Sequence, residues 1–169
     1  MIKIGSNIRK FSTYSCQPKT KEELSLMIKK RMYEDGNKCD LNDIDVSLIT
    51  DMEFVFCGTD FNGNISNWDV SNVKNMRGMF YRTMFNQDIS NWDVSNVENM
   101  ELMFSCSKFN KDISNWNVNK VRNMNQMFYI SKFNGDISNW KINKDCVTYE
   151  MFDCCQIEEE NKPKKLQQQ

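Results

Sequence analysis

The sequence contains no histidine among its 169 residues. This absence excludes Ser-His-Asp and Cys-His catalysis, histidine-ligated metals and the usual general base near neutral pH. Carboxylate or lysine chemistry would remain, but the sequence shows no clustered arrangement of such residues. We therefore expect a protein that is not an enzyme and that has no catalytic residues and no cofactor.

Long apolar runs and strong charge are also absent. No apolar run reaches the roughly 18 residues of a membrane-spanning helix. The N-terminus has no apolar stretch of about 7–15 residues, so it does not resemble a signal peptide. The net charge of −1 gives no long-range attraction to nucleic acid or anionic membrane. We expect a cytosolic protein without membrane insertion and without a nucleic-acid partner.

The seven cysteines are odd in number and have no C-x-x-C spacing. Without an export signal, this pattern indicates free thiols rather than disulfides. Zinc sites with recognisable spacing look different, so we expect no metal site.

A repeat is the main positive feature of the sequence. Trp68, Trp92, Trp116 and Trp140 stand 24 residues apart. The spacing divides the chain into five units, 40–63, 64–87, 88–111, 112–135 and 136–159. The first unit lacks the Trp but keeps the apolar frame, and the fifth is degenerate, since Asp145 and Thr148 replace Val and Met.

The positions within a unit predict an α/β fold. Each unit begins I-x-x-W-x-V, the spacing of a leucine-rich repeat, which predicts short strands at 66–70, 90–94 and 114–118. Apolar residues then recur at helical spacing, which predicts one helical turn per unit. We expect a short right-handed solenoid with a small parallel sheet on one face and helical turns on the other.

The segments outside the repeats are predicted to close the two ends. Residues 20–36 read as a capping helix, with Thr20 and Glu23 as a capping box and Gly36 as a stop. Residues 1–19 are expected to form an extended N-terminal segment. Residues 160–169 are polar, contain Pro163, and are expected to form a disordered tail.

The string DISNWDVSNVENMELMFSCSKFN resembles the BspA-like leucine-rich repeat family, in its mycoplasma-lipoprotein type of repeat. The resemblance covers about residues 18–153. The resemblance implies a repeat-built protein. Members are known mostly as surface proteins of bacteria and protists, and adhesion or host-protein binding is assigned to some of them. No enzymatic residue belongs to the motif.

The repeated tryptophans allow two interpretations of their role. They could form an exposed aromatic stripe for sugars or a partner helix, or they could fill the core. Because each shares a strand side with an apolar residue two positions on, we favour a structural core position for all four.

The polar columns on the opposite side of the predicted strands are the better binding candidates. Repeat solenoids commonly bind on their strand face, although repeated Asn and Ser could instead form hydrogen-bond ladders between units. The candidate partner-binding residues are Asn67, Asp69, Ser71, Asn91, Asp93, Ser95, Asn115, Asn117 and Asn119.

The sequence thus predicts a monomeric, non-catalytic protein–protein interaction module that binds another protein through its strand face. One alternative is a structural or assembly protein. Another is a carbohydrate- or host-binding surface adhesin, of which the carbohydrate-binding form would use exposed Trp.

Overall fold

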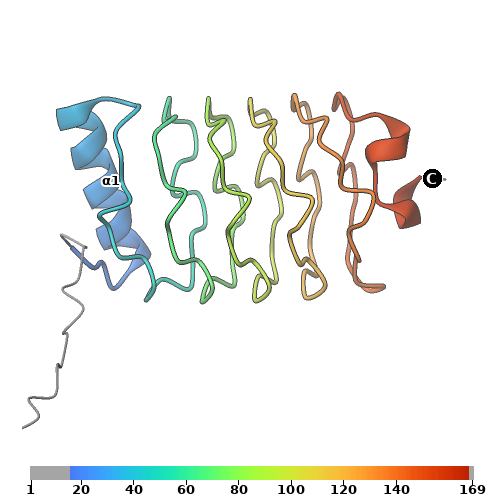
Figure 1. Cartoon of the computed structure of the whole chain (residues 1–169), viewed down its shortest axis with the longest axis horizontal. Helices are drawn as coiled ribbons and strands as arrows, with labels where there is room; N and C mark the ends of the chain where they lie inside the picture. Colours follow the sequence, from blue (N-terminus) through green and yellow to red (C-terminus); the bar gives the residue numbers. More distant parts are fainter. Residues whose placement is uncertain (1–15, 168–169) are drawn as a thin grey trace, which may run out of the picture.

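The computed structural model describes residues 16–167. Figure 1 shows this part of the chain wound into successive coils that stack along the long axis of the molecule. One α-helix, α1 (Lys21–Asp35), lies at the N-terminal end of the stack. Two 3₁₀ helices, η1 (Glu159–Asn161) and η2 (Lys164–Leu166), lie at the other end.

Helix α1 matches the capping helix expected over 20–36. The side chain of Thr20 accepts a hydrogen bond from the backbone N–H of Glu23, and the Glu23 carboxylate accepts one from the N–H of Lys19. This reciprocal pair satisfies N–H groups that a helix start leaves without partners. Gly36 ends the helix at a φ of 83°. Leu24 and Ile28 are fully buried, so α1 covers the apolar end of the first coil.

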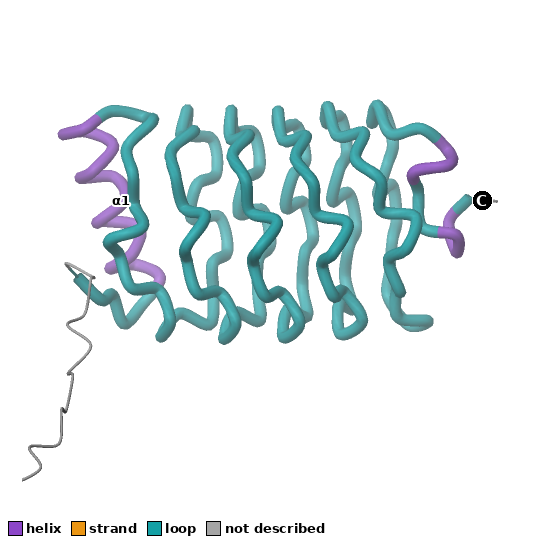
Figure 2. Tube along the Cα trace, in the orientation of Figure 1, coloured by secondary structure: helices purple, strands orange, loops and turns teal. Residues whose placement is uncertain are grey.

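The expected α/β solenoid with a parallel sheet is wrong. Within residues 16–167 the structure has no strand, only six isolated parallel bridges, and the coils are drawn as loops and turns in Figure 2. Neither the strands expected at 66–70, 90–94 and 114–118 nor the helical turns after them form. The reason lies in how each half of a coil uses its backbone hydrogen bonds.

In one half of each coil the backbone pairs with the next coil through alternate residues. In the second coil the N–H groups of Met76, Gly78, Phe80 and Arg82 donate to carbonyls of the third coil over 2.8–3.0 Å. The intervening N–H groups of Met79 and Tyr81 donate instead within the coil, three residues back. The peptide groups therefore form four hydrogen-bonded columns through the stack, which we call the amide columns.

Left-handed backbone conformations produce this alternation. Gly78 and Arg82 both have a φ of 56°, and residues at the same two positions of the other coils are also left-handed. A β-strand needs negative φ at every residue, so the stretch cannot form one. Most of these residues are not glycine: Phe54, Leu102, Gln126, Glu150, Arg82, Cys106, Ile130 and Cys154.

The other half of each coil, where strands were expected, consists of tight turns. The N–H of Trp68 donates to the carbonyl of Ile65, and the N–H of Val73 donates to that of Val70. Each bond spans three residues, as in β-turns. Side chains still alternate between inside and outside: Trp68 and Val70 are buried, while Asn67 and Asp69 are exposed. The inside–outside pattern expected of a strand therefore occurs without the strand.

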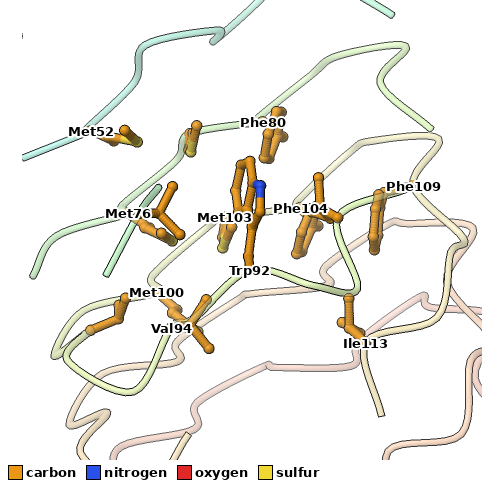
Figure 3. Close-up of a cluster of buried hydrophobic side chains, with 14 of the residues drawn as sticks. Met52, Met76, Phe80, Trp92, Val94, Met100, Met103, Phe104, Phe109 and Ile113 are labelled. Carbon is orange, nitrogen blue, oxygen red and sulfur yellow. The ribbon is translucent and has the colours of Figure 1, made fainter. Parts of the chain in front are cut away.

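Stacked aromatic rings run through the core. Phe56, Phe80, Phe104, Phe128 and Phe152 follow one another at centroid distances of 5.5–5.8 Å. A second column joins Phe61, Phe85, Phe109 and Phe133 at 6.0–6.2 Å. Figure 3 shows Trp92 with Phe104 and Met103 of its own coil and with Phe80 of the preceding coil. Each coil thus buries its apolar face against the next, which a single coil could not do.

The C-terminal segment is more ordered than the disordered tail expected over 160–169. Residues 160–167 lie partly in η1 and η2, and Ile157, Pro163 and Leu166 are buried. The N–H of Ile137 donates to the carbonyl of Asn161, which ties the segment to the last coil. Three apolar side chains spaced along a polar sequence are enough to dock it. Residues 1–15 of the expected N-terminal segment and residues 168–169 lie outside the described part.

Candidate functional site

The polar face is the surface formed by the predicted binding residues and their equivalents, at positions 42–48, 66–72, 90–96, 114–120 and 138–144. The structure exposes Asn67, Asp69, Asn91, Asp93, Asn115, Asn117 and Asn119, and leaves Ser71 and Ser95 half-buried. The nine residues therefore lie at the surface of three consecutive coils.

The column of Asn67, Asn91, Asn115 and Asn139 is exposed, and its side-chain amides donate and accept no hydrogen bond within residues 16–167. Each amide offers one acceptor oxygen and two N–H donors. This column is therefore available to a ligand without the loss of any internal bond.

The neighbouring column holds the backbone of its own coil. The Asp69 carboxylate accepts hydrogen bonds from both the N–H and the hydroxyl of Ser71, and the Asp93 carboxylate accepts one from the N–H of Ser95. Asn117 makes the same turn with Asn119. These are Asx turns, in which the side chain closes a turn two residues on. The side chains of this column therefore stabilise turns within their own coils and do not form a ladder of hydrogen bonds between coils.

These turns also affect the acidity of the carboxylates. Hydrogen bonds from Ser95 lower the pKa of Asp93 from its ordinary value, because they stabilise the charged form, and the nearby charge of Lys120 adds to the effect. Asp93 is therefore ionised at neutral pH and holds a negative charge at the centre of the polar face.

Two hollows lie on the polar face. One is lined by Asn115, Asn117, Asn119, Asn139 and Lys141, and so joins candidate residues of the fourth coil to the fifth. The other is lined by Arg31, Asp40, Asn42, Asp43 and Asn67, at the α1 end. Both hollows are open and polar, a shape that suits side chains of another macromolecule better than an enclosed small molecule.

Charge on the polar face is divided along the stack. Positions 42–48, 66–72 and 90–96 contain the acids Asp43, Asp45, Asp69 and Asp93 and no base. Positions 114–120 and 138–144 contain Lys120, Lys141 and Lys144 and no acid. The face is therefore acidic near α1 and basic toward the C-terminus, a pattern not noticed from the sequence because the columns were read one at a time.

The four tryptophans are 4–5% exposed and belong to the core. Each indole N–H donates to a backbone carbonyl 27 residues earlier, as Trp92 does to Ile65 over 3.2 Å. The indole thus fills the coil and also bonds to the preceding one. This bond could not be read from the sequence. An exposed aromatic stripe is not formed by these side chains.

Ladders between coils do form, but through asparagines other than the nine candidate residues. The side chains of Asn72 and Asn96 donate to the carbonyls of Ser47 and Ser71 in the preceding coil. Asn62, Asn86, Asn110 and Asn134 each accept from a backbone N–H of the next coil. The constant offset of 24 or 25 residues is the only sequence signal for these bonds.

The described part of the chain offers little for metal or redox chemistry. No group of three or more Cys, Asp or Glu side chains in residues 16–167 could hold a metal ion. No disulfide joins the cysteines, and burial raises the pKa of the Cys39 and Cys146 thiols. None of the helices within 16–167 has the length and apolar character needed to cross a bilayer.

Stacked 24-residue coils with an exposed, repeated polar face define a protein of the repeat class. A family model described as "Mycoplasma protein of unknown function, DUF285" matches residues 23–130 and 81–164. The two matches together cover most of the chain, so the chain belongs to this family. No curated protein and no solved structure matches it.

Proposed function

We propose that the chain is a non-catalytic protein–protein interaction module that binds a partner protein through the polar face. The observation that carries the proposal is the column of Asn67, Asn91, Asn115 and Asn139, whose exposed amides make no hydrogen bond within residues 16–167. Four identical donor–acceptor groups at the constant interval of the coils can pair with an extended segment or a regular surface.

The division of charge further defines the partner. A surface that is acidic over three coils and basic over two fits a partner with the opposite order of charges. Such pairing sets the orientation of binding and accelerates association more than it strengthens the complex. Since the charges are exposed, binding should weaken as salt is added.

The repeat pattern supports the closer relationship to the mycoplasma-lipoprotein type of BspA-like repeats as part of this proposal. An adhesin that stacks sugars on exposed Trp is disfavoured, because the four indoles are buried. A host-protein-binding adhesin would use the same polar face and remains the alternative within the same class.

The first experiment identifies the partner and then removes the asparagine column. The full chain serves as bait, and captured proteins are identified by mass spectrometry and remade in pure form. The triple variant Asn67→Ala, Asn91→Ala, Asn115→Ala should bind the purified partner at least about tenfold more weakly. Its thermal midpoint should stay close to that of the wild type, because these side chains make no hydrogen bond in the part of the chain that the structure describes. Calorimetric titration and thermal melts check the two outcomes.

The charge pattern has its own matched variants. Asp69→Asn with Asp93→Asn keeps the turn bond that Asn117 makes naturally, so it removes charge alone. It should slow association and reduce its dependence on salt. The control is Lys74→Glu with Arg122→Glu, two exposed charges outside the polar face. Binding that survives the asparagine and aspartate changes but fails with the control would place the functional surface on the other side.

A further inference from the structure

Among residues 16–167 the amide columns end at the last coil in a row of N–H donors that have no acceptor. In each of the first four coils, four alternate N–H groups donate to the coil that follows, as those of Met124, Gln126, Phe128 and Ile130 do to the fifth. Their equivalents in the fifth coil donate to no group within residues 16–167. These donors are Thr148, Glu150, Phe152 and Cys154, which we call the donor row.

A hollow lies beside the donor row. It is lined by Thr148, Glu150 and Phe152 of the last coil and by Lys162 and Leu166 of the C-terminal segment. The C-terminal segment therefore docks on the last coil without pairing with the donor row.

Phe152 ends the longer aromatic column at this hollow. One of its faces stacks on Phe128 at 5.8 Å, and the Lys162 ammonium lies 5.8 Å from its centroid. Phe56, Phe80, Phe104 and Phe128 are 0% exposed, whereas Phe152 is only half-buried. Within residues 16–167 the last ring therefore has the Lys162 side chain, and no aromatic ring, where every other ring of the column has an aromatic neighbour on its C-terminal side.

The two ends of the stack differ. At the N-terminal end α1 covers the first coil, and the Lys21 ammonium bonds the carboxylates of Asp51 and Glu53 at the start of the amide columns. If a second copy approached the donor row with its N-terminal end, its helix α1 would therefore lie between the two stacks of coils. At the C-terminal end the segment with η1 and η2 lies against the last coil, but within residues 16–167 it accepts no hydrogen bond from the donor row.

The hydrogen-bond sense of the row restricts what can pair with it. The row presents N–H groups and no carbonyls, so two copies of it cannot pair with each other. An ordinary β-strand presents N–H and C=O groups in alternation along its edge, and would satisfy only part of the row. The complementary edge is a backbone that presents carbonyls at every second residue, as each coil here presents to the coil before it.

We propose that this end of the stack is a second binding surface, which takes a backbone segment of a partner protein that presents a row of carbonyl oxygens and an aromatic ring. The carbonyls accept from Thr148, Glu150, Phe152 and Cys154, and the ring lies on Phe152. The interaction continues the four coil-to-coil interfaces already in the molecule. It is a form of strand addition, with main-chain bonds for affinity and a side-chain pocket for specificity.

Amide hydrogen exchange on the full chain tests the first part. In dilute protein the four amides of the donor row should exchange within about tenfold of an unstructured chain, and those of Met124, Gln126, Phe128 and Ile130 at least about a hundredfold more slowly. Slow exchange of the donor row in dilute protein would overturn the proposal. So would protection that rises with protein concentration, since a second copy would then be the occupant.

A synthetic peptide tests the second part. The probe copies residues 97–108, with serine in place of Cys106, and so offers the carbonyls of Asn99, Glu101, Met103 and Ser105 and the ring of Phe104. It should protect the donor row at least fivefold (about the smallest change that exchange resolves) and leave other amides unchanged. A scrambled peptide of the same composition should protect none. Equal protection by both, or none by either, would overturn the proposal.

Variants at the ring complete the test. Phe152→Leu keeps an apolar side chain but removes the flat ring, and should weaken peptide binding several-fold. Phe54→Leu, at an exposed position of the first coil, should not. Full binding by the Phe152 variant would remove the aromatic requirement and contradict the proposal.

Discussion

At the scale of the residue, each tryptophan serves its coil in two ways. Trp92 is 4% exposed, stacks near Phe80 at 6.2 Å, and donates its indole N–H to the carbonyl of Ile65. The ring contributes buried apolar area, and the N–H satisfies a buried carbonyl of the preceding coil. These two contributions can be separated by substitution.

Trp92→Ala should lower the free energy of unfolding by about 3–5 kcal/mol, because it empties a large interior site. Trp92→Phe keeps an aromatic ring but loses the hydrogen bond, and should cost about 1–3 kcal/mol. Urea denaturation measures both values. A cost for Trp92→Ala below about 1 kcal/mol, typical of surface changes, would contradict the buried position.

The binding residues show what could be predicted at this scale and what could not. The apolar period of 24 residues, together with the spacing of Trp68 and Val70, places Asn67 and Asp69 outside. The turn made by Asp69 with Ser71 was not predicted, although D-x-S is a recognisable Asx-turn spacing. The distinction between the free Asn67 column and the bonded Asp69 column depends on geometry that the sequence does not contain.

At the scale of the element, the strands were predicted wrongly because the apolar spacing was given more weight than the turn residues. Ser66-Asn67 and Ser71-Asn72 lie inside the two turns of the second coil, and Ser-Asn pairs recur in the coils that follow. Such pairs favour turns, whereas a strand of five residues would hold them in extended conformation. The left-handed residues carry no such signal, since only Gly58 and Gly78 among them are glycine.

Helix α1 was predictable because its signals are local. The Thr20–Glu23 capping box, the Gly36 stop and the buried Leu24 and Ile28 are all visible in 17 residues of sequence. The ion pairs that attach it to the first coil were not visible. The Lys21 ammonium lies 2.7 Å from the Asp51 carboxylate and 3.4 Å from that of Glu53.

Lys21→Met should reduce stability by about 0.5–1 kcal/mol, since the groups are partly exposed and solvent screens them. Lys29→Met is the control, because Lys29 is exposed on the same helix. Thermal melts at neutral pH compare the two. An equal loss in both variants would mean that the ion pair contributes nothing.

The pH dependence of that contribution follows from the pKa shifts. Burial opposes ionisation of Asp51, but hydrogen bonds from Lys21 and from the N–H of Glu53 outweigh it and lower the pKa below 3.8. The Asp51 contribution is thus present above that value and lost as the pH falls through the lowered pKa. The hydrogen bond that the Lys21 ammonium donates to the Asp51 carboxylate raises the pKa of Lys21 above 10.5, so its contribution is lost only as the pH rises through that raised value. The difference between wild type and Lys21→Met should therefore shrink as the pH falls below 3.8 and through the lowered pKa of Asp51.

At the scale of the whole molecule, the repeat and its period were predictable, and the stacking of coils follows from them. A coil cannot bury its apolar face without neighbours, so stability depends on contacts between adjacent coils. What the sequence could not supply was the form of those contacts, because alternate hydrogen bonding leaves no trace in the apolar pattern.

Position along the stack should determine how far a local defect spreads. Trp140→Ala should free the amides of the fourth and fifth coils to exchange while the first three coils stay protected. Trp92→Ala, in the central coil, should weaken protection on both sides. Hydrogen exchange followed by mass spectrometry measures this directly. Uniform loss of protection in both variants would show that the stack unfolds as one unit.

The uniform sense of the amide columns also makes the molecule electrically polar. Every peptide group in them has its carbonyl toward α1 and its N–H toward the C-terminal end. Each peptide unit has a dipole of about 3.5 D, and aligned units add head to tail as in a helix. The stack thus carries a permanent electric moment that grows with each added coil. Its negative pole lies where the Lys21 ammonium sits, and its positive pole lies at Thr148 and Glu150. The field of this dipole would orient an approaching chain so that its carbonyl oxygens face the positive pole before any contact forms.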